Sequence, residues 1–310
     1  GMNGLIVNVS PHIRAKDSTQ TIMRDVLIAL IPAVVASVIF FGFRALLVEV
    51  ISVVFAMFFE WGFEKVCKRK NTIGDLSAAV TGLILALNLP VTIPVWQIIF
   101  GDLVAIVVVK QLFGGIGHNF ANPAITARIV MLLAFAGPMT NWVAPHHAVA
   151  DAVTSATPLV TLGNGGSVSL LSLFLGNVGG SLGETSALAL LIGGVYLMVR
   201  KVISWHTPVA FIGTVFILSL IKGGAVFGLA EILAGGLFLG AIFMATDYAT
   251  TPSTNAGRVV FGIGAGLLTC VIRFFGNYPE GVSFSILLMN ILSPYISKWT
   301  RSKPLGGVKV

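Results

Sequence analysis

The feature that most constrains this chain is a series of long apolar runs with almost no charged residue inside them. A helix that crosses a bilayer needs about 20 mainly apolar residues, within a range of about 17–25. On that template the sequence predicts about ten crossings, over residues 22–43, 45–63, 73–89, 95–113, 124–136, 185–199, 208–221, 229–245, 259–275 and 282–295. Only 10% of the 310 residues are charged, against about 25% in soluble domains. The sequence therefore predicts an all-α integral membrane protein with a single membrane domain over residues 1–310.

The lysines and arginines predict the orientation of these helices. If the N-terminus is cytoplasmic, all 19 except Arg44, Lys222 and Arg273 fall on the cytoplasmic side. Basic residues are concentrated on that side of membrane proteins, so we expect both termini in the cytoplasm and a multi-pass chain in the cell inner (plasma) membrane. The net charge of +7 lies in short clusters between apolar runs rather than on one face. We therefore expect membrane lipid, and no nucleic acid, as a partner.

A short sequence pattern that occurs twice in the chain predicts how the helices are organised. Residues 73–78 and 182–187 both read Gly-acid-x-Ser-Ala, and they open apolar runs that enter from opposite sides. Inverted repeats of this kind commonly frame a binding site at the membrane midplane. The expected division is a first five-helix repeat over residues 1–137, an extracytoplasmic loop over 138–182 and a second, inverted repeat over 183–310.

Ionisable residues inside apolar runs are candidates for an ion path, because a carboxylate is costly in lipid and usually faces protein or water. Asp102 is the strongest candidate, since it has no basic neighbour in sequence before Lys110. The alternative for such carboxylates is a position near a span end, where they reach headgroups or pair with a nearby base. No metal site is predicted, because the adjacent His146 and His147 point apart and lack a third ligand. The sequence contains no nucleophile–base pair, so we assign no catalytic residue.

Two segments on the expected cytoplasmic side share a pattern. Residues 114–123 and 246–255 are rich in Gly or Thr, contain a proline preceded by Asn or Thr, and lead to Arg128 and Arg258 in the next helix. Helix capping explains much of this pattern. Helix N-termini also bind anions and polar ring edges, so these ends are candidates for a cofactor site.

The interval 137–183 is weakly hydrophobic and contains no Lys or Arg. Its most distinctive part is the run Asp151, Ala152, Val153, Thr154, Ser155, Ala156 and Thr157, followed by Pro158. Taken alone, this run is compatible with an ordinary Asx-turn and Thr-Pro turn in a loop. It is also similar to the D-x-x-(S/T)-(G/S)-A-T signature of covalent flavin attachment, with Ser155 where Gly is frequent.

Several further blocks resemble one family in the same order along the chain. They are Lys110-Gln111-Leu112-Phe113-Gly114-Gly115-Ile116-Gly117, Asn122-Pro123-Ala124, Gly183-Glu184-Thr185-Ser186-Ala187-Leu188, Phe243-Met244-Ala245-Thr246-Asp247 and Tyr278-Pro279-Glu280-Gly281-Val282. Together with the flavin signature, they make the chain similar to the D subunit of the Rnf ion-translocating electron-transport complexes. The homologous B subunit of the sodium-pumping NADH:quinone oxidoreductase shares the plan.

This resemblance implies a urea-transporter-like fold and a membrane flavoprotein subunit that is not a complete enzyme alone. The subunit would relay electrons between ferredoxin and NAD, with coupled Na⁺ or H⁺ translocation, beside the other subunits of the complex. It implies FMN joined through its phosphate to Thr157 by a flavin transferase. The other residues that it implies around this flavin are Asp151, Thr154, Ser155, Ala156, Glu184 and Thr185.

The resemblance also implies a noncovalent riboflavin within the helices. Its candidate neighbours on the cytoplasmic side are Asn119, Asn122 and Arg128. Two alternatives from other functional classes stay open on the sequence alone: a small-solute channel or secondary transporter, and a membrane scaffold without redox chemistry.

Overall fold

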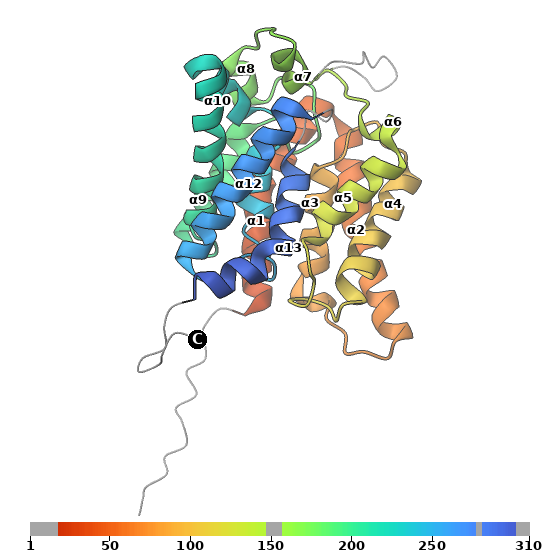
Figure 1. Cartoon of the computed structure of the whole chain (residues 1–310). Helices are drawn as coiled ribbons and strands as arrows, with labels where there is room; N and C mark the ends of the chain where they lie inside the picture. Colours follow the sequence, from red (N-terminus) through yellow and green to blue (C-terminus); the bar gives the residue numbers. More distant parts are fainter. Residues whose placement is uncertain (1–17, 147–156, 277–280, 302–310) are drawn as a thin grey trace, which may run out of the picture.

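The structure is a computed structural model that describes residues 18–146, 157–276 and 281–301 (Figure 1). Four helices are long and apolar enough to cross a membrane, namely α1 (Thr19–Phe41), α2 (Phe43–Val66), α10 (His206–Leu233) and α12 (Asn255–Phe275). Only 17–33% of the most apolar window of each is buried inside the molecule. Large apolar side chains occupy the exposed positions, as Ile39 (62% exposed) and Ile217 (57%) show. Such a surface suits lipid and not water, which confirms the predicted membrane protein.

The remaining helices of the described residues are shorter or irregular. They are η1 (Ile73–Asp75), α3 (Ser77–Leu87), α4 (Val95–Leu103), η2 (Val104–Gln111), α5 (Pro123–Ala134), α6 (Ala136–Met139), α7 (Pro158–Gly163), α8 (Leu170–Leu175), α9 (Ala187–Val199), α11 (Leu237–Leu239), η4 (Gly240–Met244) and α13 (Val282–Trp299). Both η2 and η4 are π-helical. The interior is built from these elements, because α3 is buried at every position except Thr81.

Local sequence chemistry sets several helix boundaries. Ser18 caps α1 through its side chain, and Thr254 caps α12 in the same way. Asn122 caps α5, with Pro123 at the first helical position, where proline loses no hydrogen bond. Between α1 and α2 the chain turns at Gly42, whose φ of 74° favours glycine.

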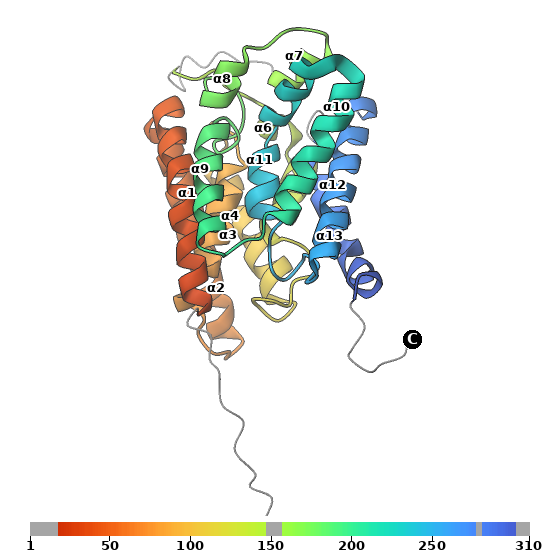
Figure 2. The same cartoon turned by 90° about the vertical axis from the view of Figure 1, so that its left-hand side faces the viewer.

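The two ends of the bundle differ (Figure 1 and Figure 2). The start of α1 and the end of α13 lie at one end, which we call the terminal end, and α6, α7 and α8 lie at the opposite end, the loop end. Basic residues cluster at the terminal end, including Lys65 in the last turn of α2, Lys68, Arg69 and Lys70 after it, and Lys298 and Arg301 at the end of α13. The described helices of the interval that was predicted to lie outside the membrane, α7 and α8, are thus opposite both ends of the described chain.

Several helices break inside the bundle, and polar side chains satisfy the freed backbone groups. The α3 helix ends at Asn88, whose carbonyl accepts a hydrogen bond from Arg128 Nε at 3.2 Å, and Arg128 Nη1 donates to Ser283 Oγ at 2.5 Å. Asn122 Nδ2 donates to the carbonyl of Met244, where η4 ends, at 3.2 Å. Broken helices are tolerated at membrane depth only when neighbours supply such partners.

The observed helices differ from the predicted spans in an instructive way. The run at 73–89 contains only 11 α-helical residues, Ser77–Leu87, which are too few to cross a bilayer alone. The runs at 208–221 and 229–245 are separated by non-helical backbone at Gly224 (φ 82°) inside α10, and the second run is interrupted again where α10 ends at Leu233. Left-handed Gly235 and Gly236 then separate α10 from α11. Hydrophobicity marked these runs but not their interruptions.

Candidate functional site

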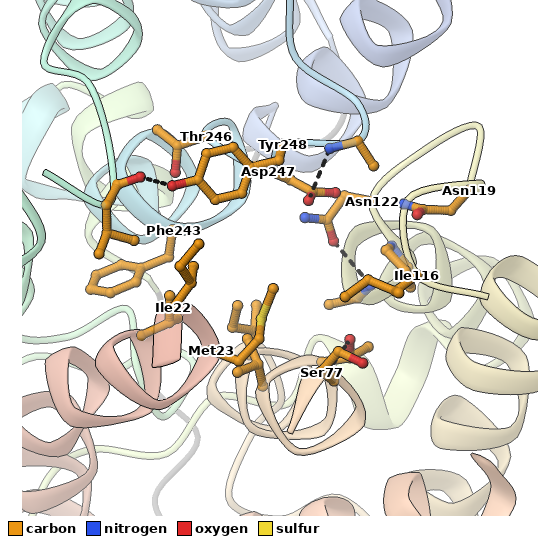
Figure 3. A pocket seen from close by; sticks show the side chains of 18 of the residues that line it. Ile22, Met23, Ser77, Ile116, Asn119, Asn122, Phe243, Thr246, Asp247 and Tyr248 are labelled. Atoms are coloured by element: carbon orange, nitrogen blue, oxygen red, sulfur yellow. Dashed lines mark hydrogen bonds between the residues drawn. The ribbon is translucent and has the colours of Figure 1, made fainter. Parts of the chain in front are cut away.

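A cavity of about 270 Å³ opens at the terminal end of the bundle (Figure 3). Its walls come from α1, α3, the end of η2 with the segment that follows, the start of α5, the end of α9 with the segment that follows, and η4 with the segment after it. Apolar side chains such as Ile22 and Phe243 form one side of the space, while Asn119, Asn122 and Asp247 project from the other parts of the wall. Largely apolar pockets with a few convergent polar groups are typical small-molecule sites.

Two of the predicted cofactor residues, Asn119 and Asn122, line this cavity. The Asn122 amide is committed to structure, since its oxygen accepts from the N–H groups of Ala124 and Ile125 and its nitrogen donates to Met244. Asn119 Nδ2 donates to the carbonyl of Ala121 at 2.9 Å. The helix-capping interpretation of the Asn-Pro pattern therefore accounts for Asn122. Asn119, by contrast, can still form further hydrogen bonds.

Arg128 is the third predicted residue, and the structure places it away from the lining of the cavity. It is buried, and its contacts to Asn88 and Ser283 join the end of α3 to the start of α13. Its position explains how three elements meet in the interior of the bundle.

Two charged residues that line the cavity, Lys110 and Asp247, were not predicted as site residues from the sequence. Asp247 lies in the connection after η4, where it accepts hydrogen bonds from the Ala249 N–H at 3.4 Å and the Thr250 hydroxyl at 3.2 Å. Burial raises the pKa of the Asp247 carboxyl above its usual range, and these hydrogen bonds oppose that shift. Both residues fall in blocks that carry the family resemblance, and that was the available signal.

The Lys110 ammonium is almost completely buried, at 3% exposure, and lies 2.6 Å from both Glu60 Oε1 and Ser77 Oγ. Gln111 Nε2 donates to the same glutamate oxygen at 2.8 Å. Pairing with a nearby base was one of the explanations expected for carboxylates in apolar runs. For Glu60 the partner is Lys110, which comes from another helix.

The second predicted cofactor region lies at the loop end. Asp151, Thr154, Ser155 and Ala156 fall outside the described residues. Thr157 is described and buried at 7% exposure, and its hydroxyl caps α7 by accepting from the Val160 N–H at 3.4 Å. The threonine predicted to carry the flavin is therefore placed at the start of a short helix.

Glu184 and Thr185 lie in the segment that leads into α9. The Glu184 carboxylate accepts from Ser181 Oγ at 2.6 Å. A Cβ built on Gly236 would lie 3.6 Å from the Glu184 carboxyl carbon, so this carboxylate borders the break between α10 and α11. The Thr185 hydroxyl is buried without a hydrogen-bond partner among the described residues.

Asp102, the predicted ion-path residue, lies in α4 and is fully buried at 0% exposure. Its Oδ1 is 2.7 Å from Ser52 Oγ, and the same hydroxyl is 2.8 Å from the carbonyl of Gly82. Its Oδ2 has no hydrogen-bond partner in the part of the chain that the structure describes. Three oxygen-bearing groups from α2, α3 and α4 thus meet inside the bundle.

Broken helices that meet at buried polar groups, with a cavity open at one end, define an all-helical polytopic membrane protein. Comparison of the sequence with known families makes the assignment specific. Residues 6–306 match the NQR2, RnfD, RnfE family, and the chain belongs to that family.

Curated relatives agree with this assignment over nearly their full length. The chain is 45% identical to the D subunit of the Na⁺-translocating ferredoxin:NAD⁺ oxidoreductase complex of Acetobacterium woodii, over 99% of this chain and 96% of the relative. It is 42% identical to the D subunit of the proton-translocating ferredoxin:NAD⁺ oxidoreductase complex of Clostridium ljungdahlii, over 98% and 97%. It is 38% identical to the D subunit of the ion-translocating oxidoreductase complex of Halorhodospira halophila, over 97% and 95%.

Proposed function

We propose that this chain is the D-type membrane subunit of an ion-translocating ferredoxin:NAD⁺ oxidoreductase complex. The observation that carries the proposal is the full-length similarity to subunits of that name, at 45% and 42% identity. The chain works beside the other subunits of the complex, and it relays electrons while the complex moves Na⁺ or H⁺. Its place is the cell inner membrane, with the terminal end in the cytoplasm.

Membrane vesicles give the test of this function. Vesicles from cells that lack the chain should lose NAD⁺ reduction by reduced ferredoxin, and the activity should return when the gene is restored. A tag on the chain should also recover the other subunits. Undiminished ferredoxin-dependent NAD⁺ reduction without the chain would remove the proposal.

The covalent cofactor that we propose is FMN, attached through its phosphate to the Thr157 hydroxyl by a flavin transferase. The seven-residue signature that ends at Thr157 supports this attachment, as does the position of Thr157 at the loop end, opposite the cavity (Figure 2). The oxygen of a phosphoester keeps lone pairs, so the capping contact with the Val160 N–H is compatible with modification. A bound flavin supplies one- and two-electron transfer, and the protein positions it.

For the cavity at the terminal end we propose a noncovalent riboflavin. Its walls fit the group, because the apolar sides accept an aromatic ring system and Asn119 and Lys110 offer polar contacts.

Asp102 and Ser52 are our proposed part of the ion path, since the buried Oδ2 of Asp102 has no partner among the described residues. The finer fold that we propose is ten crossings in two inverted five-helix repeats, in which the interrupted runs 73–89 and 229–245 each count as one crossing.

A further inference from the structure

We propose that Lys110, held in place by Glu60 and Ser77, sets its positive charge against the polar edge of the flavin ring in the cavity and so determines how readily that ring accepts an electron. The inference rests on the proposed function in one respect, namely that a flavin occupies this cavity. It adds a cofactor-binding residue and an electrostatic role for the buried Glu60–Lys110 pair.

The position of the ammonium is fixed from two sides. Glu60 Oε1 and Ser77 Oγ each lie 2.6 Å from Lys110 Nζ, and Lys110 lines the cavity. The Ser77 hydroxyl in turn contacts Asp75 Oδ1 at 2.5 Å, so it accepts from the lysine and donates to the aspartate. A lysine side chain is flexible when free, but this one has little freedom to turn away from the cavity.

The Lys110 ammonium has one more N–H donor than Glu60 and Ser77 accept. An ammonium has three N–H donors, and Glu60 and Ser77 use two of them. Most other polar groups of the wall are already engaged: Thr81 with the Ser77 carbonyl, Asn122 with Met244, Thr246 with the Ile242 carbonyl and Tyr248 with the Val202 carbonyl. The third N–H of Lys110 is therefore the charged donor available to a molecule in the cavity.

The cavity also offers a complementary acceptor. Asn119 uses its Nδ2 group toward Ala121 and Asp247, and its Oδ1 accepts no hydrogen bond from the described residues. A charged donor and an amide acceptor together suit a ring edge on which a carbonyl lies beside an imide N–H. The pyrimidine edge of a flavin has this pattern, and the apolar side of the cavity near Phe243 and Ile22 suits its benzenoid end (Figure 3).

The charges of Lys110 and Glu60 predict opposite effects on the reduction of the flavin. Negative charge develops on the pyrimidine part of a flavin when it is reduced, so a fixed cation at this edge favours reduction. Glu60 offsets the cation, because its carboxylate is buried beside it with Oε2 unpartnered among the described residues. Removing the charge of Lys110 should therefore disfavour reduction, and removing the charge of Glu60 should favour it.

The experiment is a spectroelectrochemical titration of the purified complex in a Thr157→Ala background, in which the noncovalent flavin of this chain lacks the covalent flavin as a neighbour. Lys110→Met should lower the equilibrium constant for reduction about tenfold or more, and Glu60→Gln should raise it several-fold, as expected for a unit charge close to the ring at low dielectric. Lys222→Met at the loop end is the matched control and should change nothing. The flavin content of each variant is measured by fluorescence after release with denaturant.

The outcomes separate the two proposals. If the complex of the Thr157→Ala chain releases no flavin from this subunit, the proposed cavity ligand is wrong. If flavin is present and the two charge variants shift its reduction in the same direction or not at all, Lys110 does not act as inferred. Should Lys110→Met fail to assemble, Glu60→Gln and the charge-preserving Lys110→Arg decide the matter: the glutamine variant must favour reduction and the arginine variant must retain wild-type flavin content.

Discussion

We expect Arg273 to be the side chain that contributes most to the stability of the loop end. It is 2% exposed and lies near the end of α12, where Nη1 donates to the Glu231 carbonyl at 2.7 Å and to its carboxylate at 3.0 Å. Nη2 donates to the carbonyls of Ala234 and Gly235 at 3.1 and 3.2 Å. One guanidinium thus serves three carbonyls at the end of α10 and neutralises a buried carboxylate.

The cost of removing this guanidinium follows from these contacts. In Arg273→Met the Glu231 carboxylate, at 5% side-chain exposure, loses its partner. Breaking a buried pair from one side costs about 3–5 kcal/mol, and each carbonyl left unsatisfied in a dry site costs about 1–3 kcal/mol more. Relaxation of the break between α10 and α11 will recover part of this sum. We expect a net loss of about 4 kcal/mol, which lowers the unfolding midpoint on the order of 10 °C.

The assay is thermal unfolding of the purified chain in detergent, followed by the exposure of its buried thiol Cys270 to a fluorescent maleimide. Adding Glu231→Gln to Arg273→Met should restore part of the loss, because the uncompensated charge disappears. Lys222→Met is the control, since its ammonium stacks on the ring of Phe274 without a buried carboxylate partner among the described residues. An unfolding midpoint for Arg273→Met within about 2 °C of the wild-type value would refute this reasoning.

Three further outcomes are expected. Thr157→Ala should remove the flavin fluorescence that stays with the chain on a denaturing gel, whereas Thr161→Ala, one helical turn further, should keep it; a fluorescent Thr157→Ala band would move the attachment elsewhere. Asp102→Asn should impair ion transport by reconstituted complex about tenfold or more while flavin loading stays normal, and unchanged transport would exclude Asp102 from the path. Because the pKa of Asp247 is raised in the folded protein, its contribution to stability is present at low pH and is lost as pH rises through that pKa. Asp247→Asn should therefore gain stability relative to wild type as pH rises above the ordinary pKa of an aspartate, and a constant difference in the unfolding midpoint across pH would contradict this.

Hydrophobicity and charge were sufficient to predict a helical membrane protein whose ends carry different charge. The long helices α1, α2 and α12 lie where the apolar runs are, because lipid contact requires continuous apolar residues. The interruptions were not predictable from hydrophobicity. The end of α3 before Asn88 and the end of α10 at Leu233 depend on partners from distant parts of the chain, such as Arg128 and Arg273.

The candidate site was predictable to a similar extent. The segment 114–123 predicted a site near Asn119 and Asn122, and both line the cavity. The sequence alone does not distinguish the capping role of Asn122 from a binding role, since both use the same Asn-Pro start of a helix. Lys110 was missed as a site residue because its partners, Glu60 and Ser77, are 50 and 33 residues away in sequence. Only packing brings them together.

The most direct test of the central claim, that electrons pass through this chain, compares the assembled complexes that contain wild-type, Thr157→Ala and Thr161→Ala subunits. NAD⁺ reduction by reduced ferredoxin is measured on complexes whose subunit composition is first shown to be equal. We expect the Thr161→Ala complex to be as active as wild type and the Thr157→Ala complex to lose at least about tenfold of the rate, since an electron carrier is missing. Full activity of an intact Thr157→Ala complex would contradict the claim.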